Sequence, residues 1–504
     1  MSENSWHEND SYEALELADT LTLSVEEEDI AEPSPLDEGF ERRRLKAAVI
    51  LASIWLAVIF LHTVDWGSWV ILGLTGGMAA QMLRAFLGKP MLHSPVSLAS
   101  LVAEPTGQAV WQESSPQVAP SELLATTIAT TPAVTLMVSA KNEEAVIEKL
   151  VRNLCGLDYP ADCYEVWIID DASTDRTPKI LQQLQQEFPQ LNVFQRAVGA
   201  TGGKSGALNQ VLPQTQGEFL VVFDADAQIQ PDFLQQALPI FLTQERVGAL
   251  QLRKAIAQSE IPGSPEAGNF WVEGQRSEML LDAFMQQQRI AVGGIGELRG
   301  NGQIVRRQAL MDCGGWNEET ITDDLDMTFR LHLSGWDIHC FSLPPVYEEG
   351  VTTAIALWHQ RNRWAEGGYQ RYLDYWRLIA KNRMGTKKTV DLLVFWLMQY
   401  AMPTAAVPDF VIAIARHRPL LLTPISILTF FFFVFSTLRG IRRKQLASGQ
   451  GFENFWQAWG LPLFQALQGF VYMMHWFVVV GSVTARMAFL PKRLKWVKTM
   501  HKGS

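Results

Sequence analysis

Five long apolar runs constrain this chain more than any other feature of its sequence. Two lie near the N-terminus, at residues 47–64 and 66–83, and three lie near the C-terminus, at residues 392–415, 420–438 and 461–483. Each has 18 or more residues, which is long enough for a helix to cross the hydrocarbon core of a bilayer. A buried core helix is the alternative for any single run. Together the five runs predict a membrane protein with a soluble middle.

Basic residues beside the apolar runs predict how the runs are oriented. Three arginines and a lysine lie at residues 42–46, before the first run, and Arg84 and Lys89 follow the second. By the positive-inside rule, both ends of this helix pair face the cytoplasm. The three C-terminal runs conflict with that rule, because three more spans place the C-terminus outside whereas the basic residues of 491–504 place it inside. Two prolines also interrupt the first of these three runs, so four to six spans remain open.

Charge and cysteine content narrow the function classes. Residues 1–40 hold 13 acidic side chains and no Lys or Arg, so this segment, predicted to be disordered, accounts for the net charge of −11. The remaining chain is nearly neutral and gives no indication of nucleic-acid binding. The four cysteines form no CxxC pair, which indicates neither a zinc site nor a disulfide framework and favours a reducing compartment.

The middle of the chain has the pattern of an α/β domain. Short β-rich runs at residues 134–139, 166–169, 219–223 and 248–252 alternate with helical stretches. Such alternation predicts a mostly parallel sheet with helices on both faces. Because open sheets of this kind bind ligands beyond the carboxyl ends of their strands, polar residues that directly follow a strand are candidate site residues.

Two acidic pairs directly follow predicted strands. Asp170 and Asp171 come after one strand, and Asp224 and Asp226 come after another, separated by one alanine. A single pair could cap the helix that follows it, but two pairs at successive strand ends predict a binding site. Carboxylate oxygens are hard ligands, and they suit a Mg²⁺ or Mn²⁺ ion that bridges a diphosphate.

A third acidic cluster contains Asp323, Asp324 and Asp326, ahead of a predicted helix over residues 327–333. Capping and the helix dipole favour carboxylates at such a position, so a structural role is the alternative. Three carboxylates within four residues also repel one another, which raises a pKa and can prepare a general base.

A segment with the sequence QRNRW follows in aromatic surroundings and contains Gln360, Arg363 and Trp364. Taken alone, it could be an amphipathic helix at a membrane interface, with aromatic anchors and snorkelling arginines. Its position after the three acidic motifs favours a functional interpretation.

In this order and spacing, these residues resemble the motifs of the membrane-bound family 2 glycosyltransferases, the group of cellulose, hyaluronan and glycolipid synthases. The similarity covers residues 134–372. It implies an α/β fold of the GT-A (Rossmann-like) type with a mostly parallel sheet, flanked by transmembrane helices. Three of the matching motifs belong to the nucleotide side: the first strand and turn with Asn142 and Glu143, the nucleotide-binding pair Asp170 and Asp171, and a KxGALN-like segment with Lys204. The other three are the metal-binding DxD of Asp224 and Asp226, a TDD in place of the usual TED with Asp324 as the base, and QxxRW at Gln360 to Trp364.

The resemblance implies an inverting transfer from a UDP-sugar. In such a reaction Mg²⁺ or Mn²⁺, held through Asp224 and Asp226, neutralises the diphosphate, and Asp324 deprotonates the acceptor hydroxyl. Arg363 is expected to stabilise the diphosphate charge, and Trp364 to offer an aromatic face to the sugar or acceptor.

Within the family, the layout most resembles the glycolipid synthases of photosynthetic bacteria, which move glucose from UDP-glucose to 1,2-diacylglycerol and form β-monoglucosyldiacylglycerol. Few membrane helices and no regulatory domain after them favour a single transfer at the lipid bilayer. A processive β-glucan or hyaluronan-type polysaccharide synthase is one alternative, and a non-catalytic membrane scaffold is another. Glucose and galactose differ at one hydroxyl, and both remain candidate donor sugars.

The predicted organisation has seven parts. They are a disordered acidic tail (1–41), two transmembrane helices (42–88), a linker (89–132), a cytoplasmic GT-A catalytic domain (133–350), an interfacial QxxRW segment (351–388), transmembrane or interfacial helices (389–490) and a basic tail (491–504).

Overall fold

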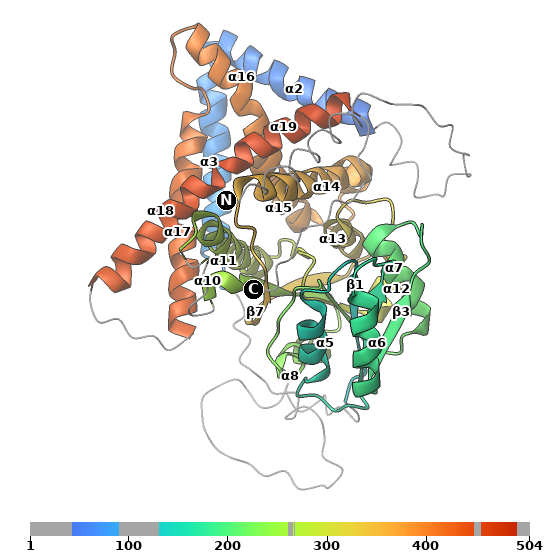
Figure 1. The fold of residues 1–504 in the computed structure, drawn as a ribbon. Helices are drawn as coiled ribbons and strands as arrows, with labels where there is room; N and C mark the ends of the chain where they lie inside the picture. Colours follow the sequence, from blue (N-terminus) through green and yellow to red (C-terminus); the bar gives the residue numbers. More distant parts are fainter. Residues whose placement is uncertain (1–42, 90–130, 261–265, 267, 448–454, 491–504) are drawn as a thin grey trace, which may run out of the picture. The chain divides into compact units, whose positions relative to one another are not determined.

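The computed structural model describes residues 43–89, 131–260, 266, 268–447 and 455–490. The predicted acidic tail, nearly all of the predicted linker and the basic tail therefore lie outside the described residues. The described part combines a mixed sheet, helices on both of its faces and a group of long apolar helices (Figure 1).

Seven strands form one sheet in the order β3-β2-β1-β4-β6-β5-β7. All neighbouring strands pair in parallel except β6, which runs antiparallel to both β4 and β5. The predicted fold class, a mostly parallel GT-A-like sheet, is confirmed. The strands are β1 Val134–Ala140, β2 Tyr164–Asp170, β3 Leu191–Gln195, β4 Phe219–Phe223, β5 Val247–Ile256, β6 Gln303–Arg306 and β7 Asp337–Glu348.

The alternation of side chains along the strands explains how both faces of the sheet are covered. In β1, Leu136 and Val138 point into one apolar core with helices α5, α6, α8 and α9, while Met137 points into a second core with α7, α12 and α13. All five residues of β4 are fully buried, as expected for a central strand between two helical layers. These helices are α5 Ile147–Cys155, α6 Thr177–Glu187, α7 Gly203–Val211, α8 Phe233–Ala237, α9 Pro239–Thr243, α12 Arg307–Asp312 and α13 Asp323–Leu333.

Two long helices, α11 Phe270–Ala291 and α14 Ala354–Ala380, lie between the sheet and the apolar helices. Residues of α11 contact β5 and β7 as well as α17 and α18, and α14 contacts α13 as well as α19. The sheet is thus joined to the apolar helices through these two elements.

Among the described residues, four helical segments are long and apolar enough to cross a membrane, judged by length and composition: Arg43–Thr63, Thr386–Ala415, Thr423–Arg443 and Trp456–Phe489. The second predicted run forms α3 Gly67–Phe86, which is not among these four. A tight turn joins α2 Arg43–Thr63 to α3, and it requires glycine, because a Cβ on Gly67 would lie 1.9 Å from the Leu61 carbonyl oxygen.

The run 392–415 is not broken by its prolines. Helix α15 Thr386–Trp396 continues through one π-helical turn, Leu397–Ala401, directly into α16 Met402–Ala415. Pro403 and Pro408 both lie within this continuous helical segment, and the π-helical turn lies just before Pro403. The remaining helices are α2 Arg43–Thr63, α10 Ala257–Glu260, α17 Thr423–Ala447, α18 Leu461–Met473 and α19 His475–Phe489, with short turns at Leu212–Gln214 and Trp456–Gly460.

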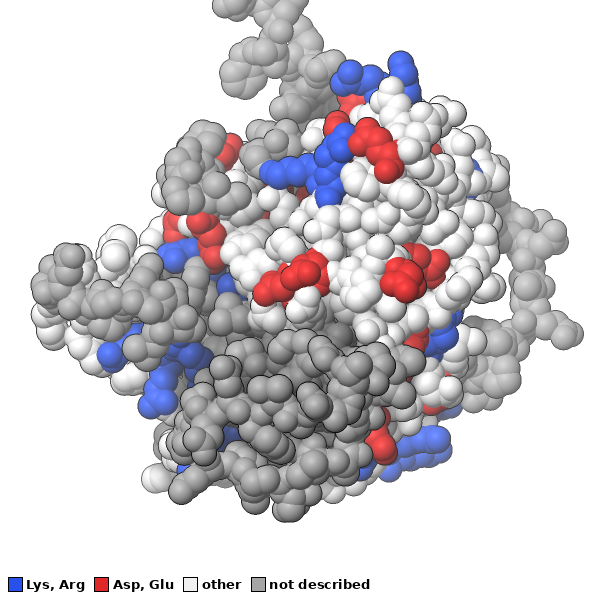
Figure 2. Space-filling model, turned by 90° about the horizontal axis from the view of Figure 1, so that it is seen from below, with Lys and Arg blue, Asp and Glu red and all other residues white. Residues whose placement is uncertain are grey.

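The surface seen in Figure 2 carries both signs of charge in small, interspersed groups. Exposed pairs such as Arg152 with Glu187 (2.7 Å) and Arg176 with Glu144 (3.1 Å) have the same mixed character. This distribution is typical of a solvated face. All four cysteines are free thiols, as the sequence predicts.

Candidate active site

A cavity of about 1470 Å³ begins at the carboxyl ends of β1, β2 and β4 and continues between the apolar helices. Nine of the eleven predicted site residues line it. Asn142 and Asp170 do not. The nine are Glu143, Asp171, Lys204, Asp224, Asp226, Asp324, Gln360, Arg363 and Trp364.

Asn142 and Asp170 hold together the two loops that frame the predicted nucleotide site. Asn142 has a positive φ of 55°, and its Oδ1 accepts a hydrogen bond from the Thr174 amide at 2.7 Å. Asp170 is 1% exposed, and its Oδ1 accepts from the Ser173 amide at 3.2 Å. Both side chains therefore hold the backbone of the loops in place without lining the cavity.

Asp171 points into the cavity at the end of the same strand. The Arg196 guanidinium donates to its Oδ1, and the Lys141 ammonium lies 3.6 Å from its Oδ2. Arg196 also donates to the carbonyl oxygens of Thr201 and Gly203, which fixes the glycine-rich turn before α7. This glycine-rich turn places Lys204 beside the cavity.

Lys204 and the DxD residues meet at the end of β4. The Lys204 Nζ donates to Asp224 Oδ1 at 2.6 Å, and the Glu349 amide donates to Asp226 Oδ2 at 2.7 Å. Burial alone would lower the pKa of Lys204, but the carboxylates of Asp224 and Asp323 outweigh burial and raise it. Lys204 is therefore a firmly charged cation among carboxylates.

The carboxylates of Asp224 and Asp226 fit a divalent cation of the magnesium type. No group of three or more His, Cys, Asp or Glu ligands lies together within the described ranges. Mg²⁺ is usually bound by one or two carboxylates together with water and substrate phosphates, so two carboxylates at a diphosphate site suffice. The Lys204 ammonium against Asp224 shows that this position already favours a positive charge.

Asp324 lies in the first turn of α13, because this helix begins at Asp323 and not at residue 327 as the sequence pattern indicated. Burial, with the charge of Asp323 as the next cause, raises the pKa of the Asp324 carboxyl to about 6. A Cβ on Gly300 would lie 3.5 Å from the Oδ2 of Asp324, an ordinary van der Waals contact, and the positive φ of 82° at Gly300 is what favours glycine there.

Asp326, by contrast, points away from the cavity. Its Oδ2 accepts from Arg330 Nε at 2.7 Å, and its Oδ1 accepts from Tyr375 at 2.8 Å and from Asn317 at 3.2 Å. The structure thus divides the acidic cluster into residues that face the cavity and one that anchors α13 to α14.

The QRNRW segment lies in the second turn and beyond of α14, and it places three of its five side chains on the cavity. Burial lowers the pKa of the Arg363 guanidinium, opposed by the charges of Asp224 and Asp324, which shows that it faces the same carboxylates. Trp364 lies between the cations of Arg361, 3.9 Å from its ring centroid, and Lys254, at 5.1 Å.

Arg361, which the sequence analysis did not single out, is fully buried. It donates to Glu278 Oε2 at 2.6 Å, to the Tyr472 hydroxyl at 3.2 Å and to Gln360 Oε1 at 2.9 Å. Trp476 donates to the other oxygen of Glu278 at 2.9 Å. Arg361 therefore ties α14 to α11 and to the C-terminal helices, and it fixes the Trp364 ring by stacking.

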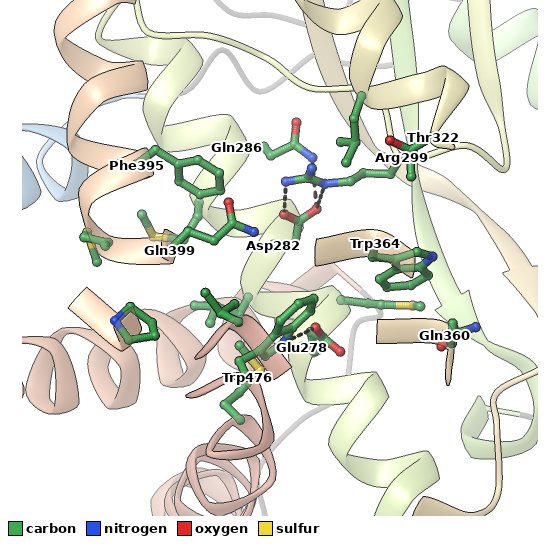
Figure 3. Close-up of a pocket in the computed structure, with 18 of the residues that line it drawn as sticks. Glu278, Asp282, Gln286, Arg299, Thr322, Gln360, Trp364, Phe395, Gln399 and Trp476 are labelled. Atoms are coloured by element: carbon green, nitrogen blue, oxygen red, sulfur yellow. Dashed lines mark hydrogen bonds and ion pairs between the residues drawn. The ribbon is translucent and has the colours of Figure 1, made fainter. Parts of the chain in front are cut away.

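A second buried network, also missed from sequence, lies beneath Asp324. Arg299 donates to Asp282 at 2.9 Å and to Glu297 at 3.0 Å, and Arg371 pairs with Glu297 at 2.7 Å. In Figure 3 the Arg299 side chain reaches across to Asp282, and the amide of Gln399 points toward the same region from the membrane helices. Arg371 and Gln399 are distant in the sequence from the other three residues, and the five belong to no local motif, so only the fold identifies them.

We call Asp282, Arg299 and Gln399 the polar neck. Beyond it, the lining of the cavity becomes apolar. The lining there comes from α15 to α19 and includes Phe395, Met398, Met402, Phe432 and Val480. Each is an apolar side chain on a helix that also carries long apolar stretches. One continuous cavity therefore has a charged end at the sheet and an apolar end among the helices.

Three comparisons with known proteins bear on the identity of the chain. The model of the family described as "Glycosyltransferase like family 2" matches residues 132–367. β-Monoglucosyldiacylglycerol synthase of Trichormus variabilis is 52% identical over 509 residues, covering 100% of both chains. The synthase of the same name from Synechocystis sp. is 52% identical over 505 residues, covering 99% of this chain and 97% of that relative. Among solved structures, the mannosyltransferase PcManGT from Pyrobaculum calidifontis, in complex with GDP-Man and Mn²⁺, has a TM-score of 0.48 at 19% identity, covering 83% of this chain and 98% of that chain.

Proposed function

The chain belongs to glycosyltransferase family 2, and we propose that it transfers glucose from UDP-glucose to 1,2-diacylglycerol with inversion, forming β-monoglucosyldiacylglycerol. Full-length identity of 52% to two synthases of this glycolipid supports the reaction. The observation that carries the proposal is the single cavity whose charged end contains the predicted donor site and whose apolar end lies among the membrane helices.

The apolar end of the cavity favours a lipid acceptor over a growing polysaccharide. Met398, Met402 and Phe432 offer no hydrogen-bond partners, and the polar side chains in or beside this part, such as Gln399, Ser426 and Thr429, are too few for the many hydroxyls of a sugar polymer to regain the hydrogen bonds they lose from water. Diacylglycerol has a single hydroxyl and two acyl chains, which match a cavity that is polar at one end and apolar at the other.

The donor is expected to bind at the edge of the sheet. Asp171 and Glu143 line the part of the cavity beside β1 and β2, where hydrogen-bond acceptors can receive the uracil and ribose groups. Lys204 donates to Asp224 and the guanidinium of Arg363 feels the charge of the same carboxylate, so both cations suit the diphosphate. A Mg²⁺ or Mn²⁺ ion held by Asp224 and Asp226 would supply further neutralisation of the leaving group's charge.

The transfer itself needs a base, for which Asp324 is the candidate. The acceptor oxygen attacks C1 of glucose, the bond between C1 and the diphosphate oxygen breaks, and the acceptor proton passes to the Asp324 carboxylate. Direct displacement of an α-linked donor gives a β-linked product. A pKa of about 6 lets Asp324 remain ionised at neutral pH while it stays basic enough to accept the proton.

A multi-pass arrangement with a cytoplasmic catalytic domain is part of the proposal. The four candidate spans support membrane association. Arg43, Lys46 and Arg84 lie at the ends of α2 and α3 that approach the catalytic domain, as the positive-inside rule requires for a cytoplasmic domain.

The test is an assay of the purified full-length protein in lipid vesicles with radiolabelled UDP-glucose or UDP-galactose, with and without diacylglycerol. We expect label in the organic phase only with UDP-glucose and diacylglycerol. An ethanol-precipitable glucan made without diacylglycerol would favour the polymer synthase. UDP-glucose binding without any transfer would favour the scaffold.

A further inference from the structure

The C-terminal helical segment Trp456–Phe489, which comprises α18 and α19 and the turn before them, is apolar enough to be a candidate span. Its 34 residues correspond to about 50 Å of helix at 1.5 Å per residue, whereas the hydrocarbon core is about 30 Å thick. In Figure 1 the two helices follow one another in a line that crosses α3 and α17 and does not run alongside them. The contacts along this segment show which side of the membrane it occupies.

The helices α2, α3, α16 and α17 define two opposite ends. At the far end, Arg416 donates to the His62 carbonyl at 3.0 Å, and the amides of Leu421 and Leu422 donate to the Asp409 carboxylate. Asp409 also lies 2.8 Å from the His62 ring nitrogen. The end of α2, the end of α16 and the start of α17 therefore meet at one place.

The opposite ends of the same helices meet α11 and α14, the two helices that join them to the sheet. Arg43 at the start of α2 pairs with Asp374 of α14 at 2.6 Å. Gln288 of α11 donates to the Phe86 carbonyl at the end of α3, at 2.8 Å. Arg443 near the end of α17 donates to Gln287 of α11 at 3.0 Å, and Tyr400, just before α16, contacts the Ala365 carbonyl of α14. We call this end the catalytic side.

Segment Trp456–Phe489 contacts the catalytic side near its start, in its middle and at its end, and between the first two contacts its Phe470 packs on Phe430 and Phe433 of α17, at ring-centroid distances of 4.7 and 5.6 Å. Near its start, Trp459 stacks under the Arg442 guanidinium, 4.0 Å away, at the catalytic-side end of α17. In its middle, Tyr472 and Trp476 both donate to Glu278 of α11, at 3.1 and 2.9 Å. At its end, Arg486 pairs with Glu366 of α14, and the Phe489 carbonyl accepts from Arg44 at 2.7 Å.

The exposed side chains of the segment form one apolar stripe. Trp456, Phe464, Val471 and Val478 are each about 60% exposed and follow one another at intervals of eight or seven residues, which is one face of a helix. Tryptophan at one end of such a stripe is typical of helices at the boundary between headgroups and acyl chains.

From these contacts we infer that Trp456–Phe489 does not cross the bilayer but lies in the membrane interface on the catalytic side, with its exposed stripe against the acyl chains. A straight helix cannot touch the catalytic side at its start, middle and end and also reach the far end. The crossings are then α2, α3, α15 with α16, and α17. We count α3 although it is not among the four candidate spans, because it begins beside the far end of α2 and ends at the catalytic side. The number is even, which returns the chain to the side where it began. This resolves the conflict between the number of apolar runs and the basic C-terminal residues, and it holds whichever sugar or acceptor the enzyme uses.

The test compares the accessibility of single cysteines in sealed vesicles of known orientation, using a membrane-impermeant maleimide. The background carries Cys163→Ser and Cys313→Ser, because these native thiols are only half-buried. Val198→Cys, in an exposed loop of the catalytic domain, reports the catalytic side, and Arg418→Cys, between α16 and α17, reports the far side. We expect Leu490→Cys to be labelled from the side of Val198→Cys. Labelling of Leu490→Cys from the side of Arg418→Cys would overturn the inference.

A measurement of depth in the bilayer tests the inference even if maleimide reaches Leu490→Cys poorly. A fluorophore is attached at Phe464→Cys or at Val478→Cys and quenched by lipids brominated at shallow or deep acyl positions. An in-plane helix places both fluorophores at the same shallow depth. A spanning helix separates them by 14 residues, about 20 Å along its axis, and unequal quenching would therefore contradict the inference.

Discussion

At the scale of single residues, the site is defined by which carboxylates face the cavity. Asp324 and Asp326 are two residues apart and have different surroundings. Both carboxylate oxygens of Asp326 accept hydrogen bonds, from Arg330, Tyr375 and Asn317, whereas Asp324 lines the cavity. The acidic motif alone could not separate these roles, because the separation depends on the start of α13 at Asp323.

Asp324→Asn should lower turnover by about 10² to 10⁴ and leave UDP binding intact, because the amide preserves shape but accepts no proton. The measurement pairs an initial-rate assay with calorimetric titration of UDP. Asp326→Asn is the matched comparison, and we expect it to lower the melting temperature more than the catalytic rate. A normal rate in Asp324→Asn would show that the base is another group.

The pH dependence of kcat/KM should have an acidic limb near pH 6, since the pKa of Asp324 is raised to about 6 and only the ionised form can act as base. Activity is therefore expected to fall as the pH drops through 6. Asp323→Asn removes a neighbouring charge that raises this pKa, so the limb should move to lower pH. A limb that stays in place in this variant would assign it to a different residue.

Divalent cations should be required, because two carboxylates and a diphosphate otherwise repel one another. EDTA is expected to abolish transfer and Mg²⁺ or Mn²⁺ to restore it, and Asp226→Asn should raise the metal concentration needed for half-maximal rate. Full activity in chelator would contradict a metal at Asp224 and Asp226.

At the scale of elements, α14 connects the chemistry to the membrane helices. Arg361 holds Glu278 and the Tyr472 hydroxyl while it stacks on Trp364, a combination that needs the planar guanidinium. Arg361→Lys is therefore expected to raise the KM for diacylglycerol and leave the KM for UDP-glucose nearly unchanged. Arg377→Lys, an exposed position on the same helix, is the control, and equal effects of the two substitutions would refute this role.

The sequence predicts elements well where one local pattern determines them. The fully buried β4 was predicted with its observed bounds, and β1 and β2 to within two residues, because their apolar runs are continuous and end at polar site residues. Three strands, β3, β6 and β7, are not among the four apolar runs that the sequence pattern predicts. β3 has only one buried residue of five, and β7 is interrupted by two prolines, so their pairing is set by neighbours in the sheet.

At the scale of the whole molecule, the proposed transfer reaction depends on one cavity that serves both substrates. Sequence motifs located its charged end, because those residues follow strands whose carboxyl ends meet at one edge. The apolar end and the polar neck of Asp282, Arg299 and Gln399 could not be predicted, because each is assembled from several elements that no local sequence motif connects.

The most direct test of this claim is photocrosslinking with a diacylglycerol that carries a diazirine in one acyl chain, mapped by mass spectrometry in the presence of UDP. We expect crosslinks at cavity-lining residues such as Met398, Met402 and Phe432, and we expect excess diacylglycerol to suppress them. Crosslinks confined to outward-facing residues such as Leu56 or Leu393, with none competed by diacylglycerol, would contradict a lipid acceptor in the cavity.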